Sequence, residues 1–114
     1  MNQISKARVE KFSAQNGLCH YCKQPMWERD PHEFAERFAL NDRRLNWLRS
    51  TAEHLHARCD GGKDTKNNIV AACRFCNAHR HHACKALPPE AYGQHVRKRL
   101  AAGKWHGLHL RPLC

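Results

Sequence analysis

The spacing of apolar residues in the first half of the chain predicts two helices. Over residues 4–16 the apolar side chains can share one broad face of a helix, and Gly17 follows as a natural stop. Asp30 precedes a proline, and a glutamate follows three residues after the aspartate, a pattern typical of a helix N-terminus. We therefore expect a second helix over about 31–48, with its charged positions facing solvent.

The second half of the chain predicts two strands and two further helices. The segments 51–57 and 68–72 read as short strands joined by the polar loop RCDGGKDTKN, whose Asp-Gly-Gly is a turn signal. A helix over about 74–87 is expected next, ended by two prolines, and a last helix over 89–103. The tail KWHGLHLRPLC has no clear period and predicts no element.

Length and charge limit the class of protein. The chain has 114 residues, enough for one domain and not comfortably two, so we expect a single domain over 1–114. Lys and Arg total 20 against 10 Asp and Glu, and an acidic partner would relieve the self-repulsion of this +10 net charge. Nucleic acid is the obvious partner, and a merely soluble basic surface is the alternative.

The cellular setting is inferred from segments that the sequence lacks. The N-terminus, MNQISKARVEKF, has no apolar stretch of the signal-peptide type, and no run approaches the roughly 18 apolar residues of a membrane-spanning helix. We expect a cytoplasmic protein without a membrane partner, in a compartment that keeps thiols reduced. Seven cysteines are then better candidates for metal ligands than for disulfides.

Two Cys-x-x-Cys pairs predict a metal site. Cys19 and Cys22 form the first pair, within a predicted tight turn, and Cys73 and Cys76 form the second. Two such pairs complete a tetrahedral zinc site with no open position, so the zinc would be structural. A redox role is the rival, but it needs only one pair in a thioredoxin-like setting. The remaining cysteines, read by default as ordinary small side chains, are Cys59, Cys84 and Cys114.

Between Ala52 and Arg80 the chain reads AEHLHARCDGGKDTKNNIVAACRFCNAHR. The order is an acidic residue with His, then Gly-Gly, then Asn before an apolar pair, then Cys-x-x-Cys-Asn and a basic residue. It resembles the HNH endonuclease family. The resemblance implies an α+β fold with a small ββα-metal core over about 17–87, stapled by zinc and flanked by extra helices. The residues that carry it are Glu53, His54, Gly61, Gly62, Asn68, Cys73, Cys76, Asn77 and Arg80.

The sequence departs from the family pattern at three places. Glu53 stands where Asp is more usual, and the longer carboxylate can still bind a divalent ion. Ala57 replaces the common proline, a change that concerns loop stiffness more than chemistry. The segment 26–50, with the inserted helix, is longer than in minimal members, and we expect it to bear on substrate choice.

The residue types suit phosphodiester hydrolysis. A neutral imidazole can take the proton of the attacking water, which makes His54 the candidate general base. Glu53 and Asn77 offer oxygen ligands for a hard divalent ion such as Mg²⁺ or Mn²⁺. His81 lies one helical turn after Asn77 and is a further candidate ligand, with a solvent-facing histidine as the equal alternative. The resemblance implies that Asn68 braces the loop and orients His54.

Four basic residues are candidate phosphate contacts. They are Arg80, which the family pattern favours, and Arg74, Lys63 and Lys66. Together these features predict a metal-dependent DNA endonuclease of bacterial or phage origin. A catalytically inactive, zinc-stabilised DNA-binding module is the main alternative. An RNA-directed nuclease is less favoured because no aromatic stacking platform is visible, and a protein-interaction domain would leave the net charge unexplained.

Overall fold

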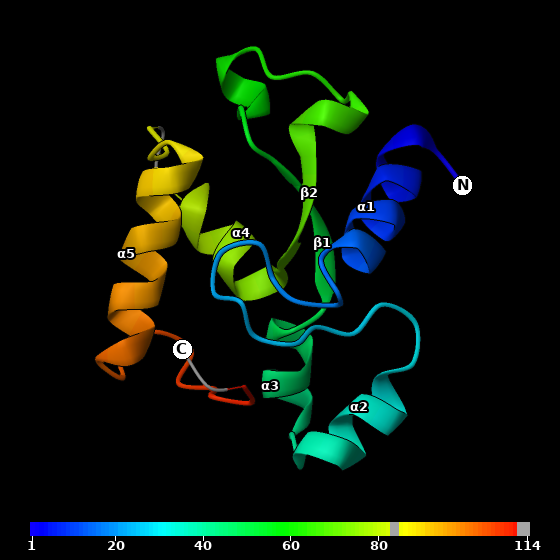
Figure 1. The fold of residues 1–114 in the computed structure, drawn as a ribbon, viewed down its shortest axis with the longest axis vertical. Helices are drawn as coiled ribbons and strands as arrows, with labels where there is room; N and C mark the ends of the chain where they lie inside the picture. The colour runs from blue at the N-terminus through cyan, green and yellow to red at the C-terminus, as the bar shows by residue number, and fades with distance from the viewer. Residues whose placement is uncertain (83–84, 112–114) are drawn as a thin grey trace.

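A computed structural model describes residues 1–82 and 85–111 of the chain. It is a mixed fold, so the α+β prediction is confirmed. One small two-stranded sheet lies near the middle of the molecule, and helices lie on both sides of it and beyond one of its ends (Figure 1). The elements are α1 (Gln3–Ala14), α2 (Pro31–Phe38), α3 (Asp42–Trp47), β1 (Ser50–His54), β2 (Ile69–Cys73), α4 (Arg74–Arg80) and α5 (Pro89–Ala101), with 3-10 turns η1 (Arg58–Asp60) and η2 (Lys66–Asn68).

The sheet is an antiparallel pair of strands that a helix follows directly. The register pairs Ser50 with Cys73 at one end and His54 with Ile69 at the other. Strand β2 is buried along its whole length. Figure 1 shows α1 and α4 on opposite sides of the pair. On the α1 side, the Gln15 side chain accepts from the Ala71 backbone N–H and donates to its carbonyl, which satisfies the outer edge of β2.

The knuckle, residues 18–26, forms the tight turn that the sequence predicts. Leu18 and Pro25 form an isolated antiparallel bridge, and the Cys19 N–H donates to the Gln24 carbonyl at 2.9 Å. Lys23 closes the turn with a positive φ of 63°. The His20 N–H donates to the Ala71 carbonyl at 3.0 Å, so the knuckle is attached to the middle of β2.

Several predicted boundaries are wrong. The helix expected over 31–48 is two helices, because Ala39 turns into the left-handed region (φ 53°) and Asn41 caps α3 with its side chain. Strand β1 ends at His54 rather than at residue 57, because the segment before Ile69, which would pair with residues 55–57, is the 3-10 turn η2. The helix expected over 74–87 ends at Arg80, whose side chain binds the Leu87 carbonyl of the returning chain.

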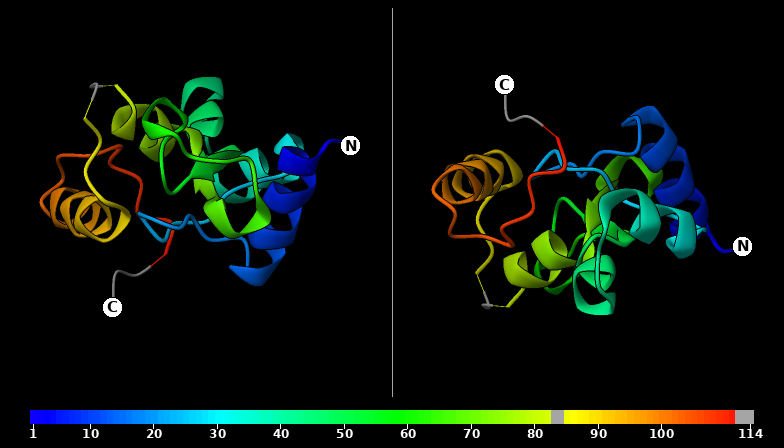
Figure 2. Two further views of the ribbon diagram at one scale, coloured as in Figure 1. Left: turned by 90° about the horizontal axis from the view of Figure 1, so that it is seen from above. Right: turned by 90° about the horizontal axis from the view of Figure 1, so that it is seen from below.

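The C-terminal segment has no regular structure in its described part, yet it is well anchored. Helix α5 buries Tyr92, Val96 and Leu100, and the chain then turns back at Gly103. We call residues 104–111 the C-terminal strap. Figure 2 shows it in red, leaving the end of α5 and passing beside the blue knuckle. Leu108 of the strap is buried in the core.

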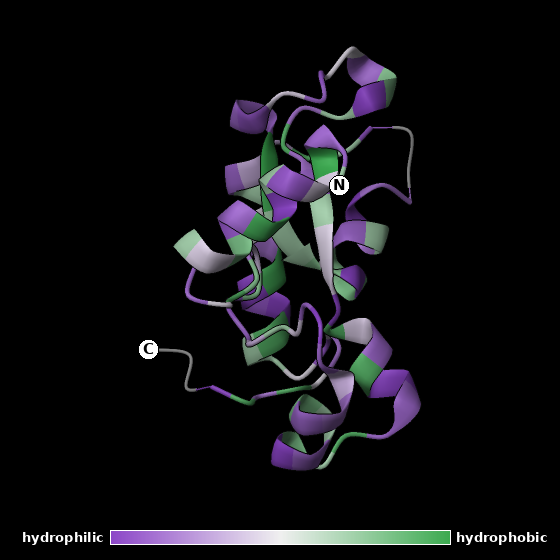
Figure 3. Ribbon diagram, turned by 90° about the vertical axis from the view of Figure 1, so that its right-hand side faces the viewer, coloured by the Kyte–Doolittle hydropathy of each residue, from purple (hydrophilic) through white to green (hydrophobic). Residues whose placement is uncertain are grey.

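The hydrophobic core surrounds the four paired cysteines. Green, hydrophobic residues concentrate on the strands and the inner faces of the helices in Figure 3, and purple residues cover the outer faces. The four paired cysteines are among the most completely buried side chains, together with Tyr21 and Leu48. A core this small gains much from a metal that links its parts. Among the described helices, none is both long and apolar enough to cross a membrane.

Candidate active site and metal centre

The four paired cysteines meet in one buried cluster. Their sulfur atoms all lie within 4.8 Å of one another, and Cys22 and Cys73 are 4.0 Å apart. A tetrahedral zinc with bonds of about 2.3 Å needs sulfur–sulfur separations of about 3.8 Å, so the spacing fits. Burial raises the pKa of the Cys73 and Cys76 thiols, and a cation among the sulfurs would offset that cost. The cluster is positioned to bind a metal ion.

The ligand candidates come from three elements. The knuckle carries Cys19 and Cys22, Cys73 is the last residue of β2, and Cys76 lies in the first turn of α4. The Cys73 sulfur also caps α4 by accepting from the Cys76 N–H at 3.4 Å. Of the other cysteines, Cys59 is exposed, whereas Cys84 and Cys114 lie outside the described residues.

Glu53 is a fully buried carboxylate with three side-chain partners. Its Oε2 accepts from the Tyr21 hydroxyl at 2.6 Å and from Arg80 at 2.9 Å, and its Oε1 lies 2.7 Å from His81 Nε2. Burial, and then the charge of Glu53, raises the pKa of Tyr21, which keeps its hydroxyl protonated as a donor. The Arg80 guanidinium balances the carboxylate charge inside the protein.

Arg80 faces inward. Its side chain is 3% exposed and donates to Glu53 and to the backbone carbonyls of His54, Leu55 and Leu87. A phosphate contact, as the sequence predicts for this residue, does not fit that geometry. The basic residue of the motif instead ties the end of α4 to the end of β1, which sets the position of Glu53.

His54 ends β1 and pairs with a carboxylate that the sequence analysis did not single out. His54 Nε2 lies 2.8 Å from Asp64 Oδ1. Arg58 donates to both oxygens of Asp64, each at 3.0 Å. The hydrogen bond with His54, and then the one from Arg58, lowers the pKa of Asp64, so it is ionised. In the sequence, the one local feature that could have indicated Asp64 is its position two residues after Gly61-Gly62.

Asn68 holds the two sides of the loop together. Its Oδ1 accepts from the His56 N–H at 2.8 Å, and its Nδ2 donates to the carbonyls of His56 and Lys63 at 3.0 and 2.8 Å. Gly62 lies in the same closure, where a Cβ would come 1.8 Å from the His56 carbonyl oxygen. Only glycine fits there, which explains the second glycine of the motif. All of these hydrogen bonds join Asn68 to the loop backbone, so its role is to hold the loop closed.

Asn77 faces β1 from helix α4. Its Nδ2 donates to Thr51 Oγ1 at 3.0 Å and to the Ala52 carbonyl at 3.1 Å. Within the described ranges its Oδ1 accepts no hydrogen bond, so this oxygen remains available to a ligand. Asn77 is also one of the residues that line a cavity of about 390 Å³. The lining residues are Glu53, His54, Ala57, Arg58, Cys59, Asn77 and His81.

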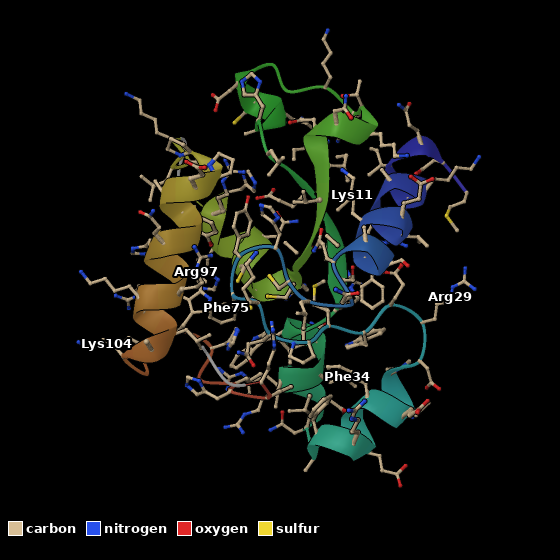
Figure 4. The ribbon with its side chains drawn as sticks, in the orientation of Figure 1. Lys11, Arg29, Phe34, Phe75, Arg97 and Lys104 are labelled. Atoms are coloured by element: carbon tan, nitrogen blue, oxygen red, sulfur yellow. The ribbon has the colours of Figure 1, made fainter. Side chains whose placement is uncertain are left out.

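The other predicted phosphate contacts are exposed but differ in setting. Lys66 forms a 2.9 Å ion pair with Glu10 on the α1 side. Figure 4 shows Lys11 of α1 beside β2, and this residue donates to the Lys66 and Ile69 carbonyls. Arg74 and Lys63 have no ion-pair partner among residues 1–82 and 85–111.

Comparison with known proteins supports the resemblance seen in the sequence. The model of the HNH endonuclease family matches residues 41–83. The match spans α3, both strands and α4, and so includes the cavity residues and the second cysteine pair. No curated protein and no solved structure is significantly similar to the chain. Residues 41–83 of this chain are therefore similar to the HNH endonuclease family.

Proposed function

We propose that this chain is a metal-dependent endonuclease that hydrolyses DNA phosphodiester bonds. HNH domains act typically on nucleic acids, and the net charge of +10 suits such a partner. The observation that carries the proposal is the convergence of four side chains on one cavity. They are Glu53, His54, Asn77 and His81: one candidate base and three candidate ligands, brought together from β1, the middle of α4 and the residue after α4.

Two metal ions have separate places in this proposal. A zinc ion held by Cys19, Cys22, Cys73 and Cys76 would be structural, since four buried ligands leave no open position. A divalent ion, Mg²⁺ or Mn²⁺, would supply charge relief for the phosphate and the leaving oxygen when bound in the cavity. The donors for it are Glu53 Oε1, Asn77 Oδ1 and His81 Nε2. The hydrogen bonds from Asn77 Nδ2 to β1 fix the orientation of the amide, and within the described residues Oδ1 accepts no hydrogen bond.

His54 would act through its Nδ1 atom. Nε2 lies against the ionised Asp64, which favours the tautomer with the proton on Nε2 and a lone pair on Nδ1. Nδ1 then takes a proton from water while the water oxygen forms a bond to phosphorus and a phosphorus–oxygen ester bond breaks. Asp64 positions the ring without touching the substrate, and the loop closed by Asn68 holds Asp64 in place.

A specific observation favours a second candidate, an inactive DNA-binding module. Glu53 has both oxygens engaged, by Tyr21 and Arg80 on one side and by His81 on the other. A carboxylate with three partners can be purely structural. In the endonuclease proposal, Glu53 Oε1 and His81 Nε2 would hold the divalent ion instead of bonding to each other, while Tyr21 and Arg80 would keep Oε2.

Supercoiled plasmid DNA separates the two candidates. We expect wild-type protein to cleave the plasmid with added Mg²⁺ or Mn²⁺ and not with a chelator. His54→Ala should lower the cleavage rate by about a hundredfold to ten-thousandfold and leave plasmid binding intact, because it removes only the base. His32→Ala, an exposed histidine on α2, is the matched control. Wild-type protein that binds the plasmid and never cleaves it supports the inactive module instead.

A further inference from the structure

We propose that the C-terminal strap is part of the metal centre and determines how tightly the zinc is held. The inference rests on the zinc site proposed above. Its basis is a pair of hydrogen bonds from the strap to sulfur. Trp105 Nε1 donates to Cys76 Sγ at 3.4 Å, and His106 Nε2 lies 3.5 Å from Cys22 Sγ. The strap therefore contacts one cysteine of each Cys-x-x-Cys pair.

The other two sulfurs take their donors from the backbone. Cys19 Sγ accepts from the N–H groups of Tyr21 and Cys73 at 3.4 and 3.3 Å. Cys73 Sγ accepts from the Cys76 N–H at 3.4 Å. In the described part of the chain, no backbone N–H donates to the sulfurs of Cys22 or Cys76. Among residues 1–82 and 85–111, the N–H donors to these two sulfurs come from the strap.

The chemistry of the two side chains fixes the direction of both bonds. An indole N–H can only donate. His106 Nδ1 accepts from the Leu108 N–H at 3.0 Å, so the ring proton must be on Nε2, which faces Cys22. Both side chains thus present hydrogen to sulfur. Such donors stabilise thiolates more than thiols, since hydrogen bonds to charged acceptors are the stronger ones.

Strap residues contact segments next to both cysteine pairs. Gln24 is fully buried two residues after Cys22, accepts from the N–H groups of Leu110 and Arg111, and donates to the Arg111 carbonyl. Phe75 lies between the ligands of the second pair, and its ring is 5.2 Å from that of Trp105. Figure 4 places Phe75 close to the strap that begins at the labelled Lys104. The strap is held where it can reach both sulfurs.

A buried zinc with four thiolates carries a net charge of −2, and N–H donors spread that charge over the protein. Substitution of residues that hydrogen-bond to metal ligands typically costs about 10- to 100-fold in metal affinity. Trp105→Phe keeps a ring against Phe75 and removes the donor to Cys76. We expect its zinc affinity to fall by that factor, measured by competition with a chromogenic chelator. The control is Trp47→Phe, because the Trp47 ring also lies 5.2 Å from Phe75 but bonds no sulfur.

A second readout tests the sulfurs directly. In cobalt-substituted protein, the sulfur-to-cobalt charge-transfer bands should move in Trp105→Phe and in His106→Phe, and stay unchanged in Trp47→Phe. Unaltered zinc affinity and unmoved bands in a folded Trp105→Phe protein would overturn the role of the strap. Should that variant not fold, His106→Phe decides by the same two measurements. Native protein without zinc would instead overturn the zinc site itself, and the strap proposal with it.

Discussion

The two ends of the β1–β2 strand pair have opposite character. At the Cys73 end four fully buried cysteines lie among aromatic rings, and each of their sulfurs has a hydrogen-bond partner. At the His54 end residues of a polar loop line a cavity that Asn77 also lines, and among the described residues the Asn77 Oδ1 atom accepts no hydrogen bond. Helix α4 connects them, with Cys76 in the cluster and the next residue, Asn77, at the cavity. One end is suited to holding the structure together and the other to binding a substrate. The two ends lie only a few residues apart along each strand.

Removing a sulfur ligand should have the largest effect. Cys76→Ser takes away one of the four cysteines, and binding free energy for structural zinc, about 10–16 kcal/mol in small zinc domains, is also folding free energy. We expect loss of zinc and of the cooperative melting transition together. Cys59→Ser, an exposed cysteine in the cavity wall, should change neither. Elemental analysis and thermal melting check both variants. A zinc-free Cys76→Ser protein that melts like the wild type would contradict the structural role of zinc.

Arg80 joins the two ends in a different way, by balancing a buried charge. Arg80→Met should destabilise the protein by about 3–5 kcal/mol, since it leaves the Glu53 carboxylate buried without its cation. Arg74→Met, at an exposed position on the same helix, should cost less than about 0.5 kcal/mol. Urea denaturation of the zinc-loaded variants measures the difference. Equal stability of the two variants would mean that Arg80 is not tied to Glu53 in solution.

The sequence predicted local features better than contacts between distant residues, for a physical reason. The cysteine pairs and the strands have local signals, spacing and apolar runs. The four cysteines do meet and both strands are present, although β1 ends at His54 rather than at residue 57. The contacts of Glu53 with Tyr21, and of Gln24 with the strap, join residues 32 and more than 80 positions apart, with no local pattern to announce them. Arg80 fits the family pattern in the sequence, but its inward orientation is visible only in the structure, where α4 turns it toward Glu53.

At the cavity end, Asn77→Ala should lower plasmid cleavage without abolishing it. The change removes a proposed oxygen ligand and leaves His54 in place, so the defect should shrink as Mg²⁺ or Mn²⁺ concentration rises. The His54→Ala defect should not shrink, because added metal does not restore a proton acceptor. Titration of metal ions in the cleavage assay compares the two variants. The same metal dependence in both would make Asn77 a structural link between α4 and β1 only.

The smallest expected effect concerns how DNA reaches the cavity. Arg74 and Lys63 are exposed and lack ion-pair partners within the described ranges, whereas Lys66 is paired with Glu10. Each phosphate contact contributes a slope of about −0.9 to the dependence of log affinity on log salt concentration. We therefore expect Arg74→Ala and Lys63→Ala each to reduce that slope by about 0.9, in His54→Ala protein that binds without cleaving. Lys66→Ala should change the slope less, since its charge is already paired. A slope that responds to Lys66 and not to Arg74 would place the DNA on the α1 side, away from the cavity, and would separate DNA binding from the proposed chemistry.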